Sequence, residues 1–155
     1  MGQTNSSRSV AKGFLAGVIG GLAGAGVKML AEEFFPPRVQ GQAPPSVILA
    51  EQVAGHDLPE TQQKVALHSI HWVFGALVGG VYGALVELEP SFAAWHGAAF
   101  GITLNRITHE ALLPKMGLAA PTGQQPTQER LSEWITHAAY GVGTDTVRRF
   151  VRRGL

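Results

Sequence analysis

Seven ionisable residues near the ends of apolar segments are the ones best suited to chemistry in this chain. They are Glu32, His68, His71, His109, Glu110, Glu133 and His137. Imidazole nitrogens and carboxylate oxygens bind transition metals, and imidazole also exchanges a proton near neutral pH. Helical spacing places His68 with His71, and Glu133 with His137, on one face each.

Other chemistries are excluded by what the sequence lacks. The 155 residues contain no Cys, which rules out disulfides, thiolate zinc sites, iron–sulfur clusters and cysteine nucleophiles. No P-loop, dinucleotide fingerprint or nucleophile motif is present, so we do not expect an enzyme. A net charge of +1 disfavours nucleic-acid binding, and a hydrophobic content of 45% excludes disorder.

Four segments without formal charge must position these groups. They are residues 13–27, 65–86, 90–105 and 134–144. A helix needs about 20 mainly apolar residues to cross a membrane. The second segment meets this length, the first meets it if Lys28 reaches the interface, and the other two meet it by extension through polar positions. The sequence therefore predicts an all-α, four-transmembrane-helix bundle, with a soluble or partly inserted bundle as the alternative.

Glycine placement favours the membrane bundle. Most of the 20 Gly residues lie inside the four segments, where each would cost a soluble helix about 1 kcal/mol relative to Ala. In lipid, small residues instead allow helix backbones to approach closely. We expect such close contacts at Gly17, Gly24, Gly75 and Gly79.

Basic residues at the two ends set the expected orientation. Arg8 and Lys12 precede the first segment, and four arginines follow the last. The positive-inside rule then places both termini in the cytoplasm. We expect residues 1–12 to form a cytoplasmic arm and residues 13–155 a single four-helix domain. Similar motifs ending at Pro36 and Pro114 suggest two hairpin repeats as a variant of this fold.

This topology places five candidate site residues at the outer ends of the helices. They are Glu32, His71, His109, Glu133 and His137. An unpaired polar group in lipid costs several kcal/mol, so we expect these side chains to converge on one polar cluster. Within it, His71 and His137 are expected to be closest. The alternative is that each histidine bonds a local carbonyl and faces a different neighbour.

Short motifs along the chain share their order and spacing with a known family. They are Val27–Lys28, Ala31–Glu32 and Pro36–Pro37–Arg38; His71, Phe74, Tyr82, Glu87, Pro90, Trp95 and Gly97; His109, Pro114 and Met116–Gly117–Leu118; and Ser132–Glu133, His137, Asp145 and Arg148–Arg149. In this pattern the chain resembles the bacterial inner-membrane YagU-like family, a group of unknown function. The resemblance implies a multi-helix inner-membrane fold and no particular activity. Glu110 and His68 lie outside the pattern.

These observations lead to one functional hypothesis and two alternatives. The first is a non-enzymatic accessory or regulatory bundle in the bacterial inner membrane, whose His/Glu cluster senses protons or contacts a partner. It would have no resident cofactor, and would act as a homo-oligomer or within a larger membrane complex. The first alternative is an oligomeric transporter or channel subunit. The second is a subunit that binds a transition metal or haem through its histidines.

Overall fold

The computed structural model describes residues 9–38 and 41–155, and every regular element in these ranges is helical. Three long helices form the frame, namely α1 (Val10–Phe34), α3 (Glu60–Leu88) and α6 (Thr127–Gly154). The shorter elements are α2 (Pro45–Ala54), η1 (Pro90–Gly97), α4 (Ala98–Ile107), η2 (Thr108–Leu112), α5 (Leu113–Lys115) and η3 (Thr122–Gln124). Residues 1–8 of the predicted N-terminal arm lie outside the described residues, and its last part, from Val10, already belongs to α1.

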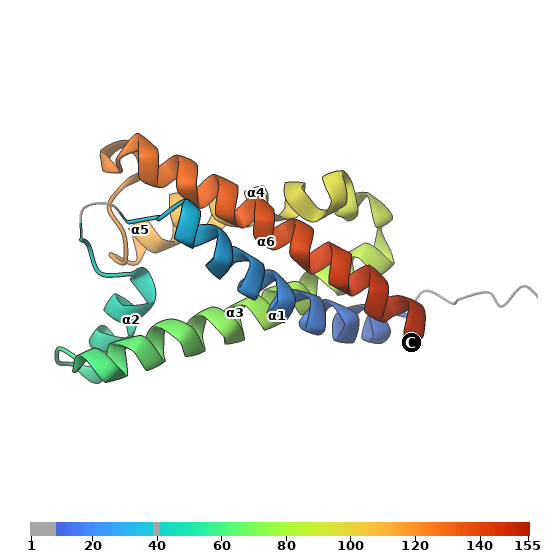
Figure 1. The fold of residues 1–155 in the computed structure, drawn as a ribbon, viewed down its shortest axis with the longest axis horizontal. Coiled ribbons are helices and arrows are strands. Elements are labelled where there is room, and N and C mark those ends of the chain that lie inside the picture. Colours follow the sequence, from blue (N-terminus) through green and yellow to red (C-terminus); the bar gives the residue numbers. More distant parts are fainter. Residues whose placement is uncertain (1–8, 39–40) are drawn as a thin grey trace, which may run out of the picture.

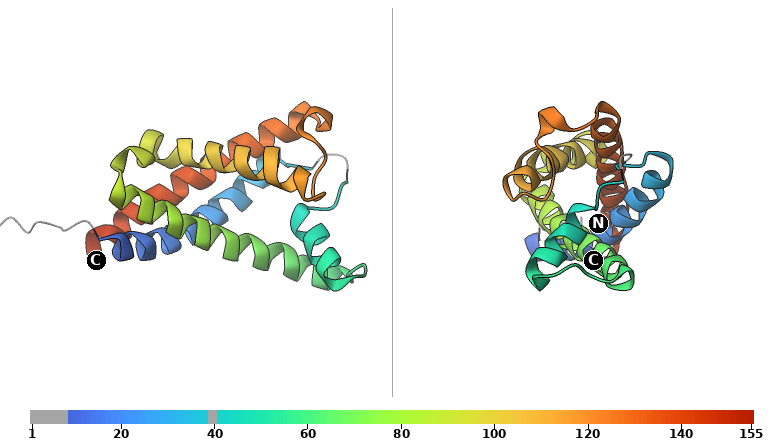
Figure 2. Two further views of the ribbon diagram at one scale, coloured as in Figure 1. Left: turned by 180° about the vertical axis from the view of Figure 1, so that it is seen from behind. Right: turned by 90° about the vertical axis from the view of Figure 1, so that its left-hand side faces the viewer.

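Helix α1 packs between α3 and α6, and α4 packs along the other side of α6 (Figure 1). Helices α3 and α4 approach each other near η1 and then diverge toward the other end of the bundle (Figure 2). The short helix α2 packs against α3 in this divergent part. The bundle is therefore closed at one end and splayed at the other.

The closed end brings both ends of the described chain together. The backbone N–H of Ser9 donates to Glu87 at 3.1 Å, and Arg152 binds the same carboxylate at 2.6 Å. The ammonium group of Lys12 donates to the carbonyl oxygen of Leu155. The start of α1, the end of α3 and the end of α6 thus share one polar edge.

The third apolar segment is not one continuous helix, which corrects the expectation for residues 90–105. The Glu89 side chain accepts from the backbone N–H of Ser91 at 3.1 Å and starts η1. The backbone then turns through left-handed conformations at Trp95 (φ 53°) and His96 (φ 52°). Only after Gly97 (φ 86°) does α4 begin. The turn lets the chain enter α4 in close contact with α6.

A proline distorts the continuation of α4. Pro114 lacks an N–H and its ring crowds the carbonyl oxygen four residues earlier, which belongs to Glu110. The chain responds with a π-helical turn over Thr108–Leu112, in which Leu113 N–H bonds the Thr108 carbonyl. The freed Glu110 carbonyl accepts a hydrogen bond from the Thr122 hydroxyl at 3.0 Å. This turn fixes the direction in which His109 projects.

Glycines lie where the long helices come closest. A Cβ at Gly17 would overlap the Gly79 carbonyl oxygen on α3, and one at Gly79 would lie 2.5 Å from the Gly17 oxygen. A Cβ at Gly24 would lie 2.7 Å from the Tyr140 carbonyl oxygen on α6. Gly75 is less tight, since its Cβ would lie 3.0 Å from that of Ala25. Gly17, Gly75 and Gly79 therefore serve the α1–α3 contact, and Gly24 serves α1–α6.

The distribution of polarity is reversed relative to a water-soluble domain. Large apolar side chains are exposed on the long helices, as at Leu30 (67%) and Leu77 (56%). The interior instead holds many polar and charged groups: Lys28, Asn105, Thr108, Glu129, Ser132, Glu133, Thr136, His137, Thr144, Asp145 and Arg148. Helices α1 and α3 are long and apolar enough to cross a membrane, judged by length and composition. Of the helices in the described residues, α4 and α6 do not meet that criterion.

Candidate polar site and its cavity

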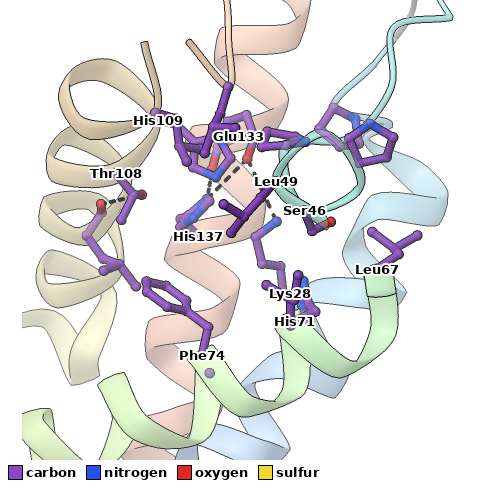
Figure 3. A pocket seen from close by; sticks show the side chains of 18 of the residues that line it. Lys28, Ser46, Leu49, Leu67, His71, Phe74, Thr108, His109, Glu133 and His137 are labelled. Carbon is purple, nitrogen blue, oxygen red and sulfur yellow. Dashed lines mark hydrogen bonds and ion pairs between the residues drawn. The ribbon is translucent and has the colours of Figure 1, made fainter. Parts of the chain in front are cut away.

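A cavity of about 500 Å³ occupies the splayed end of the bundle, between α3 and α4, with α1, α2 and α6 around it. Its walls are mainly aliphatic and aromatic. The apolar lining includes Leu49, Leu67, Ile70, Phe74, Leu104, Leu112, Leu113 and Met116. At one end the lining becomes polar and ionisable (Figure 3). The cavity is therefore amphipathic along its length.

Glu133 is the centre of this polar end, and it is 5% exposed. Its Oε1 lies 3.1 Å from the Arg38 guanidinium and 3.3 Å from Nδ1 of His109. Its Oε2 lies 3.4 Å from Nδ1 of His137 and 3.8 Å from the Lys28 ammonium. We call these five residues the outer polar cluster, after the outer helix ends at which the sequence predicts His109, Glu133 and His137. Four segments contribute to it, because Lys28 is on α1, Arg38 follows α1, His109 is in η2 and the other two are on α6.

The two histidines of the outer polar cluster contact each other edge to face, with ring centroids 4.8 Å apart. Nδ1 of His137 lies 2.8 Å from the backbone carbonyl oxygen of Glu133. Because a carbonyl only accepts, Nδ1 carries the proton and Nε2 keeps its lone pair. His109, Glu133 and His137 can each direct one ligand atom so that all three lie within 4.8 Å of one another.

The remaining predicted site residues lie beside this cluster. Glu32 forms an ion pair with Lys28 one turn earlier on α1, and its side chain is 25% exposed. His71 lines the cavity from α3, and its side chain lies beside that of Lys28 (Figure 3). The structure thus brings His109, Glu133 and His137 together. Glu32 and His71 lie next to Lys28, which in turn pairs with Glu133.

The expectation that His71 and His137 would be the closest pair is wrong, because His109 takes that position. His71 lies on the same helical face as Gly75 and Gly79, and that face packs on α1. Its ring is accordingly directed toward α1 and Lys28. His109 reaches His137 because the π-helical turn before Pro114 redirects it.

Arg38 is the member that residue-by-residue reasoning missed. It follows Pro36–Pro37, whose position ends α1, and it reaches across to α6 from an irregular segment. Helical spacing carries no signal for such a residue. The family pattern was the one signal available, since Arg38 belongs to its first motif.

Two other ionisable residues lie apart from the cluster. Oε1 of Glu110 accepts a hydrogen bond from the indole of Trp134 at 2.8 Å, and its Oε2 lies 3.7 Å from Arg106. His68 is exposed on α3. Glu110 is thus held by its own partners in a half-buried position, and neither residue contributes to the site.

A second cavity of about 440 Å³ adjoins the first beneath the segments around Gln42 and Ala120. Arg38, His109 and Leu118 line both cavities. The wall of the second cavity is more polar and includes Gln124, Gln125 and Glu129. The outer polar cluster therefore stands between a polar vestibule and the apolar cavity.

Comparisons with known proteins agree with the family pattern. The model of a family described as "Protein of unknown function (DUF1440)" matches residues 22–146, which include the whole outer polar cluster. "Inner membrane protein YagU" of Escherichia coli (strain K12) is 25% identical over 167 residues, covering 88% of this chain and 82% of the relative. No solved structure matches the chain. The chain, whose described residues form helices and include two helices apolar enough to span a membrane, thus belongs to the YagU-like DUF1440 family.

Proposed function

We propose that this protein is a four-span inner-membrane protein that binds a small amphiphilic molecule in its cavity, and that it acts as a non-enzymatic accessory subunit. The cavity that ends at the outer polar cluster is the observation that carries the binding role. The membrane location rests on the reversed polarity of the fold and on the name of its relative, an inner membrane protein.

The exposed faces of all four helical units support four spans. Ile107 is exposed on α4, and Leu131 and Val142 are exposed on α6. The polar groups of α6 face inward, where they pair with other helices. A helix with this distribution spans lipid as part of a bundle although its average hydropathy is low. This arrangement contains two helical hairpins, α1 with α3 and α4 with α6. In each hairpin the two helices pack against each other through glycines.

Both termini are proposed to lie in the cytoplasm, with the outer polar cluster near the opposite surface. The closed end carries Lys12, Arg149, Arg152 and Arg153, which fits the positive-inside rule. The shared edge of α1 and α6 supports an even number of crossings.

Cysteine labelling tests this orientation, because the natural chain contains no Cys. Gly123 and Gly154 both have open space where a Cβ would stand, so Gly123→Cys and Gly154→Cys form a matched pair. In intact spheroplasts, a membrane-impermeant maleimide should label Gly123→Cys and spare Gly154→Cys until the membrane is permeabilised. The reverse pattern, or labelling of both, would contradict the topology.

The cavity determines the chemistry of its ligand. A volume of about 500 Å³ falls in the range of pockets for small molecules. The apolar walls fit a hydrocarbon body, and the cationic groups of Lys28 and Arg38 at the polar end fit a carboxylate or phosphate head group. A membrane protein can take up such a molecule directly from the surrounding lipid.

Cavity filling tests the binding role. Leu104→Trp adds volume inside the cavity, whereas Leu77→Trp adds the same volume on the exposed face of α3. Binding of a pyrene-labelled fatty acid to the protein in nanodiscs should saturate for the parent chain and for Leu77→Trp. We expect it to weaken about tenfold for Leu104→Trp, as steric exclusion from a filled pocket requires. Equal binding to both variants, or no saturable binding to the parent chain, would refute the role.

Transport is the second candidate function, favoured by the two adjoining cavities. Arg38 and His109 separate the polar vestibule from the apolar cavity, so movement of these two side chains would connect the spaces. Such a role would require a homo-oligomer or a larger membrane complex to complete a path. Uptake of the labelled fatty acid into proteoliposomes, compared with its binding, separates transport from binding alone.

A further inference from the structure

We propose that His109, Glu133 and His137 form a binding site for a transition-metal ion of the Zn²⁺ class, with an open coordination position facing the cavity. The metal site rests on its own observations and does not require the amphiphile proposed above. Two imidazoles and one carboxylate are a ligand set that suits Zn²⁺ and its neighbours in the first transition row.

The three ligand atoms are already close to the required arrangement. They lie within 4.8 Å of one another, and tetrahedral ligation at usual zinc distances needs ligand atoms about 3.4 Å apart. Side-chain rotation would bring them to that spacing when a metal ion binds. Glu133 and His137 are one turn apart on α6, and His109 faces them from η2. The site therefore assembles from two rigid elements.

One oxygen of the carboxylate is free to act as a ligand. Oε2 of Glu133 is buried and receives no hydrogen bond from any described residue. Oε1 is held by the Arg38 guanidinium at 3.1 Å. A buried carboxylate oxygen without a hydrogen-bond partner is rare in folded proteins, and a metal ion would satisfy it.

The hydrogen bonds around the ligands also fit a metal site. Nδ1 of His137 donates to the Glu133 carbonyl at 2.8 Å, which leaves the lone pair of Nε2 available for a metal ion. Ligating histidines commonly donate their other ring proton in this way, and the bond fixes the ring. Arg38 has the same effect on the carboxylate by holding Oε1.

Local charge determines what completes the coordination. Lys28 is paired with Glu32, and Arg38 is paired with Glu133, so the surroundings are near neutral before a metal binds. A divalent ion on two neutral imidazoles would leave excess positive charge in a medium of low dielectric constant. The fourth ligand must therefore be anionic, either a hydroxide or an acidic group that enters from the cavity.

A Co²⁺ titration of the purified chain in nanodiscs tests the site, because tetrahedral Co²⁺ absorbs visible light. We expect one Co²⁺ per chain with visible absorption bands, displaced by Zn²⁺. His109→Ala and His137→Ala should each weaken binding about tenfold or more. Glu133→Gln keeps an acceptor for Arg38 while removing the charge, and should weaken binding similarly. His68→Ala, which changes an exposed histidine, should bind as the parent chain does.

A second variant distinguishes ligation from a structural role. Lys28→Met removes a positive charge 3.8 Å from the ligand oxygen, so it should tighten Co²⁺ binding about tenfold. A purely structural defect would weaken it. Size-exclusion profiles in detergent identify any variant that fails to fold. Absence of binding in the folded parent chain, or equal binding in His68→Ala, His109→Ala and His137→Ala, would overturn the proposal.

Discussion

The hydroxyl of Tyr82 donates a hydrogen bond of 2.9 Å to Oδ1 of Asp145, joining α3 to α6 at the closed end of the bundle. Asp145 is fully buried and also binds Arg148 at 2.7 Å and Arg149 at 2.6 Å. The Tyr82 ring stacks on Phe100 of α4 with centroids 4.2 Å apart. The Asp145 carboxylate thereby joins α3 to α6, and the Tyr82 ring extends the contact to α4.

Substitutions at this point should separate a hydrogen bond from a buried charge. Tyr82→Phe removes only the hydroxyl and should lower the free energy of unfolding by about 1–2 kcal/mol. Asp145→Ala leaves the buried Arg148 without its counter-ion and should cost about 3–5 kcal/mol. Denaturant unfolding in mixed micelles measures both. Equal losses would show that the buried charge of Asp145 contributes little beyond its hydrogen bond with Tyr82.

Close helix contacts predict a graded response to alanine. Gly17→Ala and Gly79→Ala each press a Cβ against backbone atoms of the facing helix, which cannot yield without moving a helix apart. Each should cost about 1–3 kcal/mol, as overpacking does. Gly26→Ala is the control, because its Cβ would lie 3.5 Å from Trp72, an ordinary contact. A melting temperature for Gly26→Ala that is lower than those of the other two variants would contradict the α1–α3 packing.

The π-helical turn predicts a coupling between Pro114 and Thr122. Thr122→Val removes the donor to the Glu110 carbonyl and should cost about 1 kcal/mol. Pro114→Ala restores an N–H that can reach the same carbonyl. In the double variant, therefore, the loss at Thr122 should be much smaller. A double-mutant cycle on unfolding free energies measures this coupling, and strict additivity would count against our account of the turn.

The pairing of Glu87 with Arg152 predicts charge-swap behaviour. Glu87→Arg places a second cation next to Arg152, and it also removes the acceptor for the Ser9 N–H. It should lower the melting temperature, and Arg152→Glu in the same chain should recover part of the loss. The acceptor for the Ser9 N–H is not restored in the double variant, so we expect the recovery of the melting temperature to be incomplete. Differential scanning fluorimetry of the parent chain, the two single variants and the double variant gives the comparison.

The apolar segments could be located from sequence because lipid requires uncharged helices, and residues 13–27 and 65–86 do lie within α1 and α3. The pairing of Glu133 with His137 could also be predicted, since residues four apart share a face. The third segment was not predictable, because its break depends on the left-handed turn at Trp95 and His96. Gly97, which ends the turn, packs against Gly141 of α6, and local composition does not predict that contact.

The details of the site depended on helix rotation and on irregular segments. His71 faces α1 because the glycines of its own face do, and spacing alone did not say which neighbour that face contacts. His109 required the π-helical turn, and Arg38 required a loop that returns to α6. Sequence periodicity describes regular helices. It therefore does not predict the positions of residues such as His109 and Arg38, which depend on breaks in those helices.

The position of α1 has a consequence for biogenesis. Its contact with α3 involves Gly17, and its contact with α6 involves Gly24. The face of α1 that carries Gly24 therefore stays unpacked until α6 has been synthesised. Until then Lys28 has Glu32 beside it but not Glu133. Membrane insertion therefore passes through an α1–α3 hairpin with an open flank. A nascent chain that stalls before α6 would present that flank to the proteases that remove unassembled membrane proteins.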